Sequence, residues 1–271
     1  MNNIADPVAA MPANVSAAAP EAAPLVLAER RGAVAWLTLN RPRARNALSM
    51  AMMDALEAAL AAARDARVVV LAGNGPGFCG GHDLREMRAH PGREFQQALF
   101  ARCSRLMLAI ARHPAPVIAA VHGIATAAGC QLVAACDLAV AAEDARFATS
   151  GVNLGLFCST PGVALARAVP RKAALEMLLT GAFVDAETAR TMGLVNRVVP
   201  QASLHVATTA LAETIAAKEK AAITIGKRAF YRQIEAPLEG AYAIAADAMA
   251  ENMCVPETEA AIDAFLNRPK A

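Results

Sequence analysis

The feature that most limits how this chain can fold is a set of short apolar runs, each followed by a turn or a helical pattern. The runs at residues 68–72 and 116–121 are apolar throughout, which is typical of strands buried on both faces. A further strand is predicted at residues 137–141. Because helical patterns separate these strands, the sequence predicts an α/β core. Repeated short strand–helix–strand units of this kind can stack as a superhelix rather than as a flat open sheet.

The rest of the chain is organised around this core. Residues 25–27 and 34–39 are predicted to be strands joined at Arg31-Gly32. After about residue 160 helical patterns dominate, with residues 194–199 as an exception that is consistent with a short strand. The predicted organisation is a disordered tail rich in Ala and Pro at 1–24, an α/β core at 25–200 and a helical C-terminal region at 201–271.

Composition narrows the class of function. Of the 271 residues, 56% are hydrophobic and 18% charged, which indicates a packed globule, and the net charge of +2 gives no electrostatic case for binding nucleic acid or a membrane surface. The chain has no uninterrupted apolar stretch of about 18 residues, so a membrane span is not expected. The six cysteines form no C-x-x-C pair and the five histidines are scattered, so we expect no metal site, reduced thiols and a cytoplasmic location.

Five segments, in this order and spacing, resemble the crotonase superfamily, which is the enoyl-CoA hydratase/isomerase family. They are residues 39–48 (LNRPRARNAL), 78–84 (FCGGHDL), 116–129, 129–137 (GCQLVAACD) and 189–199. The resemblance extends from about residue 25 to residue 268. Within the family, the sequence as a whole resembles the enoyl-CoA hydratase domain-containing subgroup, most closely from Phe147 to Arg171.

The resemblance implies a crotonase-like spiral of ββα repeats with a helical C-terminal region that mediates trimerisation. It implies a homotrimer or a dimer of trimers that acts on acyl-CoA in fatty acid metabolism as a lyase or an isomerase. Coenzyme A would then enter as part of the substrate, and no permanently bound cofactor is expected.

The small-residue turn at residues 126–131 leads into an apolar helix. Thioester chemistry places negative charge on a carbonyl oxygen, and backbone N–H groups at such a turn can stabilise it. By resemblance, the two donors of this oxyanion hole are the N–H groups of His82 and Ala128, the latter at a position where the family usually has glycine. The turn can equally reflect close packing of small residues. The His82 imidazole can contact a substrate carboxylate or water, or have no role beyond its main chain.

Hydration of an enoyl thioester needs two carboxylates, one to activate water and one to protonate the α-carbon. By resemblance these glutamates would stand at Gln131 and Gly151, neither of which can relay a proton. Other reactions of the family place acidic or nucleophilic groups near Phe157, Cys158 and Ser159, and these residues supply no such acid.

Coenzyme A carries phosphates that basic side chains bind. The resemblance assigns coenzyme A contacts to the loop after the second strand, to the loop at His82 and to the C-terminus. The residues are Arg43, Ala44, Arg45, His82, Asp83, Leu84, Arg85, Phe265 and Arg268, the last of which reaches the ligand from a neighbouring subunit.

The sequence therefore predicts an acyl-CoA-binding family member that stabilises a thioester enolate but is not an efficient hydratase. Two alternatives remain open. One is a non-catalytic acyl-CoA-binding pseudoenzyme, and the other is a member of the decarboxylase or thioesterase type.

Overall fold

The computed structural model describes residues 23–267. Most of the predicted tail, and Arg268 at the other end, lie outside these described residues. The predicted α/β fold class is confirmed: strands and helices alternate through the first two thirds of the chain, and only helices follow the last strand within the described part. None of the described helices is both long enough and apolar enough to cross a bilayer.

The large sheet has six strands. In spatial order these are β1 (Val26–Arg31), β2 (Val34–Leu39), β3 (Val68–Gly73), β4 (Val117–Val121), β6 (Leu138–Ala142) and β9 (Arg197–Val199). β1 forms an antiparallel hairpin with β2, and the other pairs are parallel. The turn between β1 and β2 contains Gly32 at a φ of 57°, a conformation that glycine adopts without steric cost.

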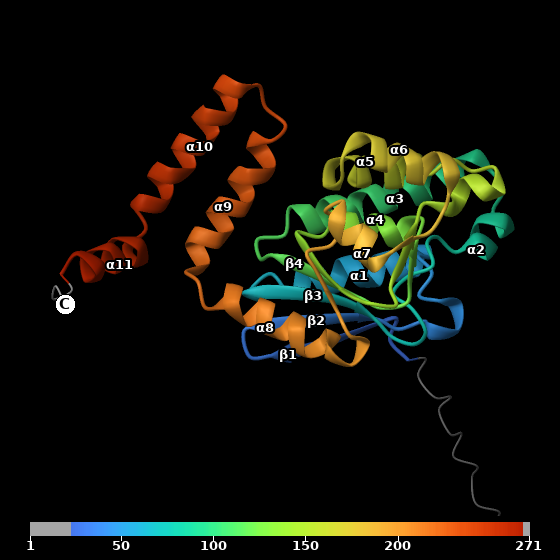
Figure 1. The fold of residues 1–271 in the computed structure, drawn as a ribbon, viewed down its shortest axis with the longest axis horizontal. Coiled ribbons are helices and arrows are strands. Elements are labelled where there is room, and N and C mark those ends of the chain that lie inside the picture. Colours follow the sequence, from blue (N-terminus) through green and yellow to red (C-terminus); the bar gives the residue numbers. More distant parts are fainter. Residues whose placement is uncertain (1–22, 268–271) are drawn as a thin grey trace, which may run out of the picture.

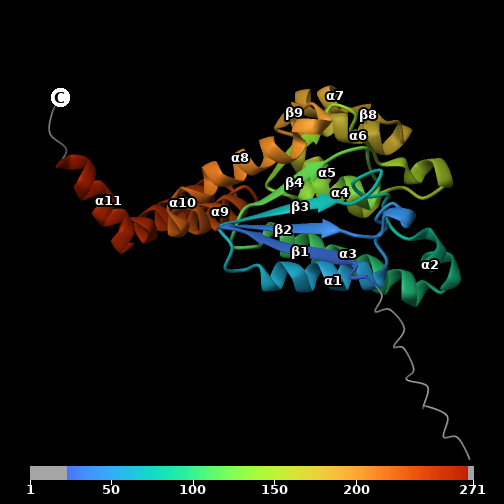
Figure 2. The ribbon, with the colours of Figure 1, turned by 90° about the horizontal axis from the view of Figure 1, so that it is seen from below.

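Both faces of the central strands β2, β3, β4 and β6 are covered, which explains why these strands are apolar at nearly every position, whereas the edge strand β1 is largely exposed. On one face Leu37 and Leu71 pack with α1 (Met50–Ala62) and α3 (Arg93–Ala111). On the other face Trp36 and Val70 belong to a second cluster with Leu204 of α8 (Leu204–Ala216). Figures 1 and 2 show α8 on the opposite side of the sheet from α1 and α3.

A second, three-stranded sheet lies beside the first and makes the ββα repeat visible. It consists of β5 (Ile124–Thr126), β7 (Arg146–Ala148) and β8 (Val184–Asp185). β4 and β5 are followed by α4 (Ala128–Ala135), and β6 and β7 are followed by α5 (Ser159–Ala168). Each repeat thus gives one strand to each sheet, and the helix that follows begins at the second sheet. The sequence analysis predicted no strand at residues 124–126, because β5 is too short to show a period.

The remaining helices complete the molecule. They are α2 (Leu84–Ala89), α6 (Arg171–Thr180), α7 (Ala186–Thr191), α9 (Lys220–Gln233), α10 (Leu238–Met253) and α11 (Pro256–Leu266), with short 3-10 helices at Pro42–Ala44, Ser150–Leu154 and Gln201–Ser203. α9 and α10 lie against each other, and α9 to α11 extend away from the sheets in both views (Figures 1 and 2). α10 and α11 bury none of their side chains in a single chain.

Candidate active site

A cavity of about 560 Å³ opens between α2, the start of α4 and the segment that leads into α5. Its walls are largely apolar. They consist of Gly80, His82, Leu84, Met87, Arg88, Phe100, Ala127, Ala128, Ser150, Gly151, Leu154, Leu156, Phe157, Cys158, Ser159, Thr160 and Pro161. The lining includes no aspartate or glutamate, and its ionisable side chains are His82, Arg88 and Cys158. Among the described residues no group of acidic, histidine and cysteine side chains is arranged to hold a metal ion.

Gly81 allows two loops of the cavity wall to touch. It has a φ of 95°, and a Cβ placed on it would lie 2.9 Å from the Ala127 Cβ and 3.4 Å from the Ala128 nitrogen. The Ala127 amide donates to the carbonyl of Ala148 over 2.9 Å, so the second loop is held against β7. Ala127 itself has a φ of 52° and a ψ of −119°, a conformation that costs a residue other than glycine free energy.

The backbone N–H groups of His82 and Ala128 have no hydrogen-bond acceptor within the described part of the chain. On either side of the His82 N–H the backbone is paired with Leu48: the carbonyl of Gly81 accepts from the Leu48 amide, and the amide of Asp83 donates to the Leu48 carbonyl. Ala128 is the first residue of α4, where helix geometry leaves the N–H without a partner in its own helix. The structure therefore brings together, on one cavity wall, the two residues that the sequence analysis paired.

The imidazole of His82 sits in an apolar corner of the same wall. Its ring meets the Phe100 ring edge to face, with the centroids 5.3 Å apart. The residue as a whole is only partly buried, but its Nε2 atom is enclosed and has no hydrogen-bond partner. Burial lowers the pKa of His82 to about 4, so the ring is neutral at pH 7.

This lowered pKa predicts how stability depends on pH. Above about pH 6.5, the ordinary histidine pKa, the ring is neutral in both states. As the pH falls from 6.5 toward 4, the unfolded chain takes up a proton that the native His82 does not, so the free energy of unfolding decreases. The loss attributable to His82 is at most about 3 kcal/mol.

Urea unfolding of the wild type and of His82→Asn between pH 4 and pH 8 measures this loss. The variant should show the shallower dependence. His113, whose pKa burial also lowers, is present in both proteins and so cancels. Parallel curves would show that the His82 ring is hydrated in the native state.

Gln131, the first position at which a hydratase glutamate was expected, is buried on α4 and does not line the cavity. Its Oε1 accepts a hydrogen bond from the Cys103 thiol of α3 over 3.7 Å. Burial raises the pKa of Cys103 to about 12, so this thiol stays protonated and can donate. Gln131 therefore links two helices behind the cavity wall.

Gly151, the second expected glutamate position, lines the cavity but has no room for a side chain. A Cβ there would lie 2.4 Å from the carbonyl oxygen of Leu156 and 2.8 Å from the Cys158 sulfur. The segment from Leu156 to Cys158 thus occupies the space that the Cβ of a glutamate at position 151 would need. Burial raises the pKa of Cys158, despite a hydrogen bond from the Gly151 backbone, so its thiol is no acid at neutral pH.

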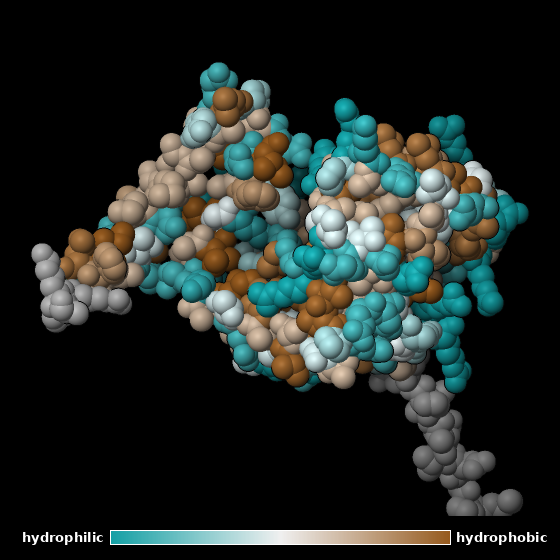
Figure 3. Space-filling view, viewed as in Figure 1, coloured by the Kyte–Doolittle hydropathy of each residue, from teal (hydrophilic) through white to brown (hydrophobic). Residues whose placement is uncertain are grey.

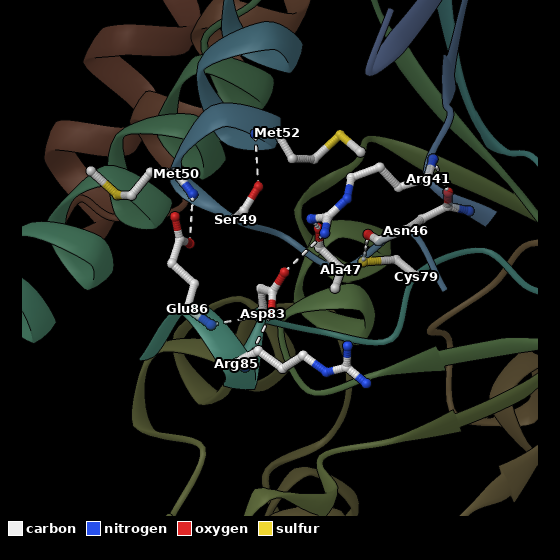
Figure 4. A network of polar contacts seen from close by, with 10 residues as sticks. All are labelled: Arg41, Asn46, Ala47, Ser49, Met50, Met52, Cys79, Asp83, Arg85 and Glu86. Carbon is white, nitrogen blue, oxygen red and sulfur yellow. Dashed lines mark hydrogen bonds and ion pairs between the residues drawn. The ribbon is translucent and has the colours of Figure 1, made fainter. Parts of the chain in front are cut away.

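A network of polar contacts behind the cavity fixes the loop that carries His82 (Figure 4). Asp83 accepts from the amides of Arg85 and Glu86 at the start of α2, and it pairs with Arg41 at 3.0 Å. Although burial opposes ionisation, the Arg41 and amide hydrogen bonds hold the pKa of Asp83 below its usual value. The fully buried Asn46 side chain donates to the carbonyls of residues 74, 77 and 78 just before this loop. Asp83 therefore orders the loop that carries His82.

The residues assigned to coenzyme A fall into two groups. Arg43 and Ala44 lie in the 3-10 helix after β2 and Arg45 ends it. This segment adjoins the cavity, since the Arg45 carbonyl accepts from the amide of Gly80, and both arginines are exposed. Leu84 lines the cavity, whereas Asp83 and the exposed Arg85 adjoin it. Phe265 lies on α11, at the far end of the molecule from α2 (Figure 1), so one chain does not bring it to the cavity. Arg268 lies outside the described residues.

Sequence reasoning missed Arg88, the one arginine of the cavity wall. It stands four residues after Leu84 on α2, so the helical period puts both on one face. That spacing could have identified it once Leu84 was placed at the site. Ser150, Leu154 and Leu156 carry no such signal, because they come from a 3-10 helix and a loop.

Comparisons with known proteins agree with this geometry. Residues 29–271 match the enoyl-CoA hydratase/isomerase family. The mitochondrial enoyl-CoA hydratase domain-containing protein 3 of Homo sapiens is 46% identical over 86% of this chain and 78% of its own length, and that of Rattus norvegicus is 43% identical over 95% and 87%. A crystal structure of an enoyl-CoA hydratase from Mycobacterium smegmatis is 58% identical and superposes with a TM-score of 0.88, covering 91% of this chain and 98% of that one. The resemblance seen in the sequence is confirmed, including its subgroup.

The expected cytoplasmic location is contradicted by these relatives, because the human and rat proteins are named as mitochondrial. The expectation rested on free cysteines, and the cysteines are indeed unpaired. Unpaired thiols show only that the fold does not depend on disulfides, so they do not distinguish one reducing compartment from another.

Proposed function

Since the chain belongs to the enoyl-CoA hydratase/isomerase family, we propose that its cavity binds an acyl-CoA thioester whose carbonyl oxygen accepts from the N–H groups of His82 and Ala128. One observation carries this proposal: two unpaired backbone donors belong to adjacent loops on one cavity wall. Backbone N–H groups that face a largely apolar cavity without an acceptor are costly, and a ligand oxygen between them would remove that cost.

The same two donors would stabilise negative charge on the oxygen when an enolate forms, and the N-terminus of α4 would add its positive dipole end. The cavity lining offers no carboxylate to activate water. We therefore propose an enolate-stabilising protein that is not an efficient hydratase. Loss of CO₂ from a malonyl-type thioester forms the enolate without a protein base: the C–C bond breaks, these donors hold the enolate oxygen, and water supplies the proton to the α-carbon.

A second candidate function is acyl-CoA binding without turnover. The protonation states of the cavity side chains favour it. His82 is neutral and Cys158 is protonated at pH 7, and neither group exchanges protons readily at that pH.

Self-association is part of the proposal. α10 exposes Leu238, Tyr242 and Met249, each at least 66% accessible, and α11 exposes Phe265. Figure 3 shows hydrophobic atoms along these extended helices. A homotrimer or a dimer of trimers would cover this surface and could bring Phe265 and Arg268 to the coenzyme A of a neighbouring subunit, opposite Arg43 and Arg45.

The experiment compares butyryl-CoA with S-butyl-CoA, a thioether that lacks the carbonyl oxygen. Ala128→Pro removes one donor at a helix position that tolerates proline, and it is made together with Ala127→Gly, which accommodates the positive φ before the proline. The reference protein is Ala127→Gly alone, which we expect to bind the thioester about tenfold more tightly than the thioether. In the double variant, which lacks the Ala128 N–H, this preference should fall to about threefold or less.

Arg93→Pro is the matched control, because Arg93 is the exposed first residue of α3 and lies outside the cavity. Calorimetry gives each dissociation constant. An unchanged thioester preference in the Ala128→Pro protein would remove Ala128 from the site, and no binding of butyryl-CoA by the wild type would refute the function.

A further inference from the structure

Asn46 is a fully buried polar residue outside the cavity lining, and the proposed function assigns it no task. In the described part of the chain, three residues other than glycine have a positive φ: Arg45 at 51°, Asn46 at 53° and Ala127 at 52°. This conformation costs free energy and is retained where the surrounding contacts enforce it. The first two residues lie in the segment that pairs with the His82 loop, and the third directly precedes Ala128. The strained backbone is therefore concentrated around the two proposed donors.

The side-chain amide of Asn46 binds only backbone atoms. Its Oδ1 accepts from the Arg41 amide over 2.8 Å. Its Nδ2 donates to the carbonyls of residues 74, 77 and 78, over 2.9, 3.1 and 3.0 Å. One side chain thus ties the segment after β2 to the turn that follows β3 (Figure 4).

The backbone on either side of Asn46 pairs with the continuation of that turn. The Arg45 carbonyl accepts from the Gly80 amide over 2.8 Å, and Leu48 forms an isolated parallel bridge with His82. Residues 45–48 therefore act as a short strand beside the segment that presents the His82 N–H.

Cys79 connects this unit to the second donor. Its amide donates to the Ile124 carbonyl over 3.1 Å and its carbonyl accepts from the Thr126 amide over 3.0 Å, so it pairs with β5, which leads to Ala128. The Cys79 thiol donates to the Asn46 carbonyl over 3.2 Å. Burial raises the pKa of this thiol to about 12, so it stays protonated and can donate. Asn46, Cys79 and β5 thus form one hydrogen-bonded unit that runs from one donor to the other.

From these contacts we propose that Asn46 is a positioning residue. It holds the segment of the His82 N–H in register with β5, so that this donor and the Ala128 N–H can reach one thioester oxygen. The inference rests on the proposed thioester site, and Asn46 itself does not touch the ligand. Because hydrogen bonds weaken steeply as their angle departs from linearity, a small displacement of one donor loosens the grip on the oxygen while the apolar cavity stays open.

The test measures how much more tightly butyryl-CoA binds than S-butyl-CoA, a ratio that depends on the carbonyl oxygen. Asn46→Gly keeps the left-handed backbone, which glycine adopts freely, and removes every hydrogen bond of the side chain. We expect the ratio to fall from about tenfold in the wild type to about threefold or less, with the dissociation constant of S-butyl-CoA changed by less than about twofold. A merely structural role would weaken the binding of both ligands and leave the ratio unchanged.

Asp137→Asn is the matched control. It disturbs another buried polar cluster, which Asp137 forms with Lys227 and the Val117 amide, and none of these residues lines the cavity. The thioester preference of this variant should equal that of the wild type. A fall in its ratio as large as that of Asn46→Gly would show that any loss of stability changes the preference, and would overturn the inference.

A second measurement needs only the wild-type protein, so it holds even if Asn46→Gly does not fold. Amide hydrogen exchange should show Leu48, Gly80 and Thr126 opening as one unit, with protection factors within about tenfold of one another, because their hydrogen bonds belong to the unit that Asn46 joins. A larger difference between Gly80 and Thr126 would show that no common unit holds the two donors.

The outcomes separate the inference from the proposed function. If the wild type prefers the thioester and Asn46→Gly keeps that preference, or loses affinity for both ligands equally, the inference fails and the thioester site stands. If butyryl-CoA does not bind to the wild type, the proposed function fails and the inference falls with it.

Discussion

Crotonyl-CoA is expected to be hydrated with a kcat well below about 1 s⁻¹, the lower end of the usual enzyme range. Each general acid or base contributes about 10²- to 10⁴-fold, and neither expected position supplies one. Gln131 is engaged with Cys103 behind the wall, and Gly151 has no side chain. The loss of absorbance of the enoyl thioester measures the rate, and a kcat between about 1 and 10³ s⁻¹ would show that another group activates water.

Restoring the two acids should not restore hydration. In Gln131→Glu/Gly151→Glu the second substitution has to move the Leu156 carbonyl, 2.4 Å from the new Cβ, and the cavity wall with it. We expect Gly151→Glu alone to lower the free energy of unfolding by about 1–3 kcal/mol. Gly226→Glu is the control, since a Cβ at Gly226 meets no atom within 4 Å. An active and stable double variant would mean that the segment from Leu156 to Cys158 moves freely.

The largest loss of stability is expected from Asp137→Asn. Asp137 accepts from the Val117 amide, from Lys227 at 2.6 Å and from the Tyr231 hydroxyl at 2.9 Å. The side chains of Lys227 and Asp137 are 8% and 14% exposed, so removing the carboxylate leaves a nearly buried ammonium without its counter-charge. Such a change costs about 3–5 kcal/mol.

This contact holds α9, and through it α10 and α11, against the start of β4. Denaturant unfolding gives the change in free energy, and amide hydrogen exchange shows whether α9 opens before the sheets. Glu235→Gln is the control, because the Arg167–Glu235 pair is 56% exposed on both sides and should contribute about 0–1 kcal/mol. Equal losses in the two variants would show that water reaches the Lys227 ammonium in the native protein.

The sequence could predict the unpaired backbone donors, but it could not predict that Gly151 has no room for an acidic side chain. The turn at residues 126–131 indicated backbone donors because small residues before a helix leave N–H groups open, a property of the local chain. That Gly151 has no space depends on Leu156 and Cys158 folding back over it, which no local pattern encodes. Likewise, the sequence does not show that the apolar residues of α10 lie on the surface of the chain rather than in its core.

The sequence by itself determined the order of the strands of the large sheet and of the helices between them, and it indicated the two loops that we propose bind the thioester. Strand period, helix period and turn chemistry act over a few neighbouring residues, so they can be read along the chain. Only the tertiary structure decided the state of the His82 ring, the isolation of Gln131 and the anchoring of α9 by Asp137, which is 90 residues from Lys227. Desolvation, steric exclusion and buried ion pairs depend on which distant segments are in contact, and the packing of the whole chain decides those contacts.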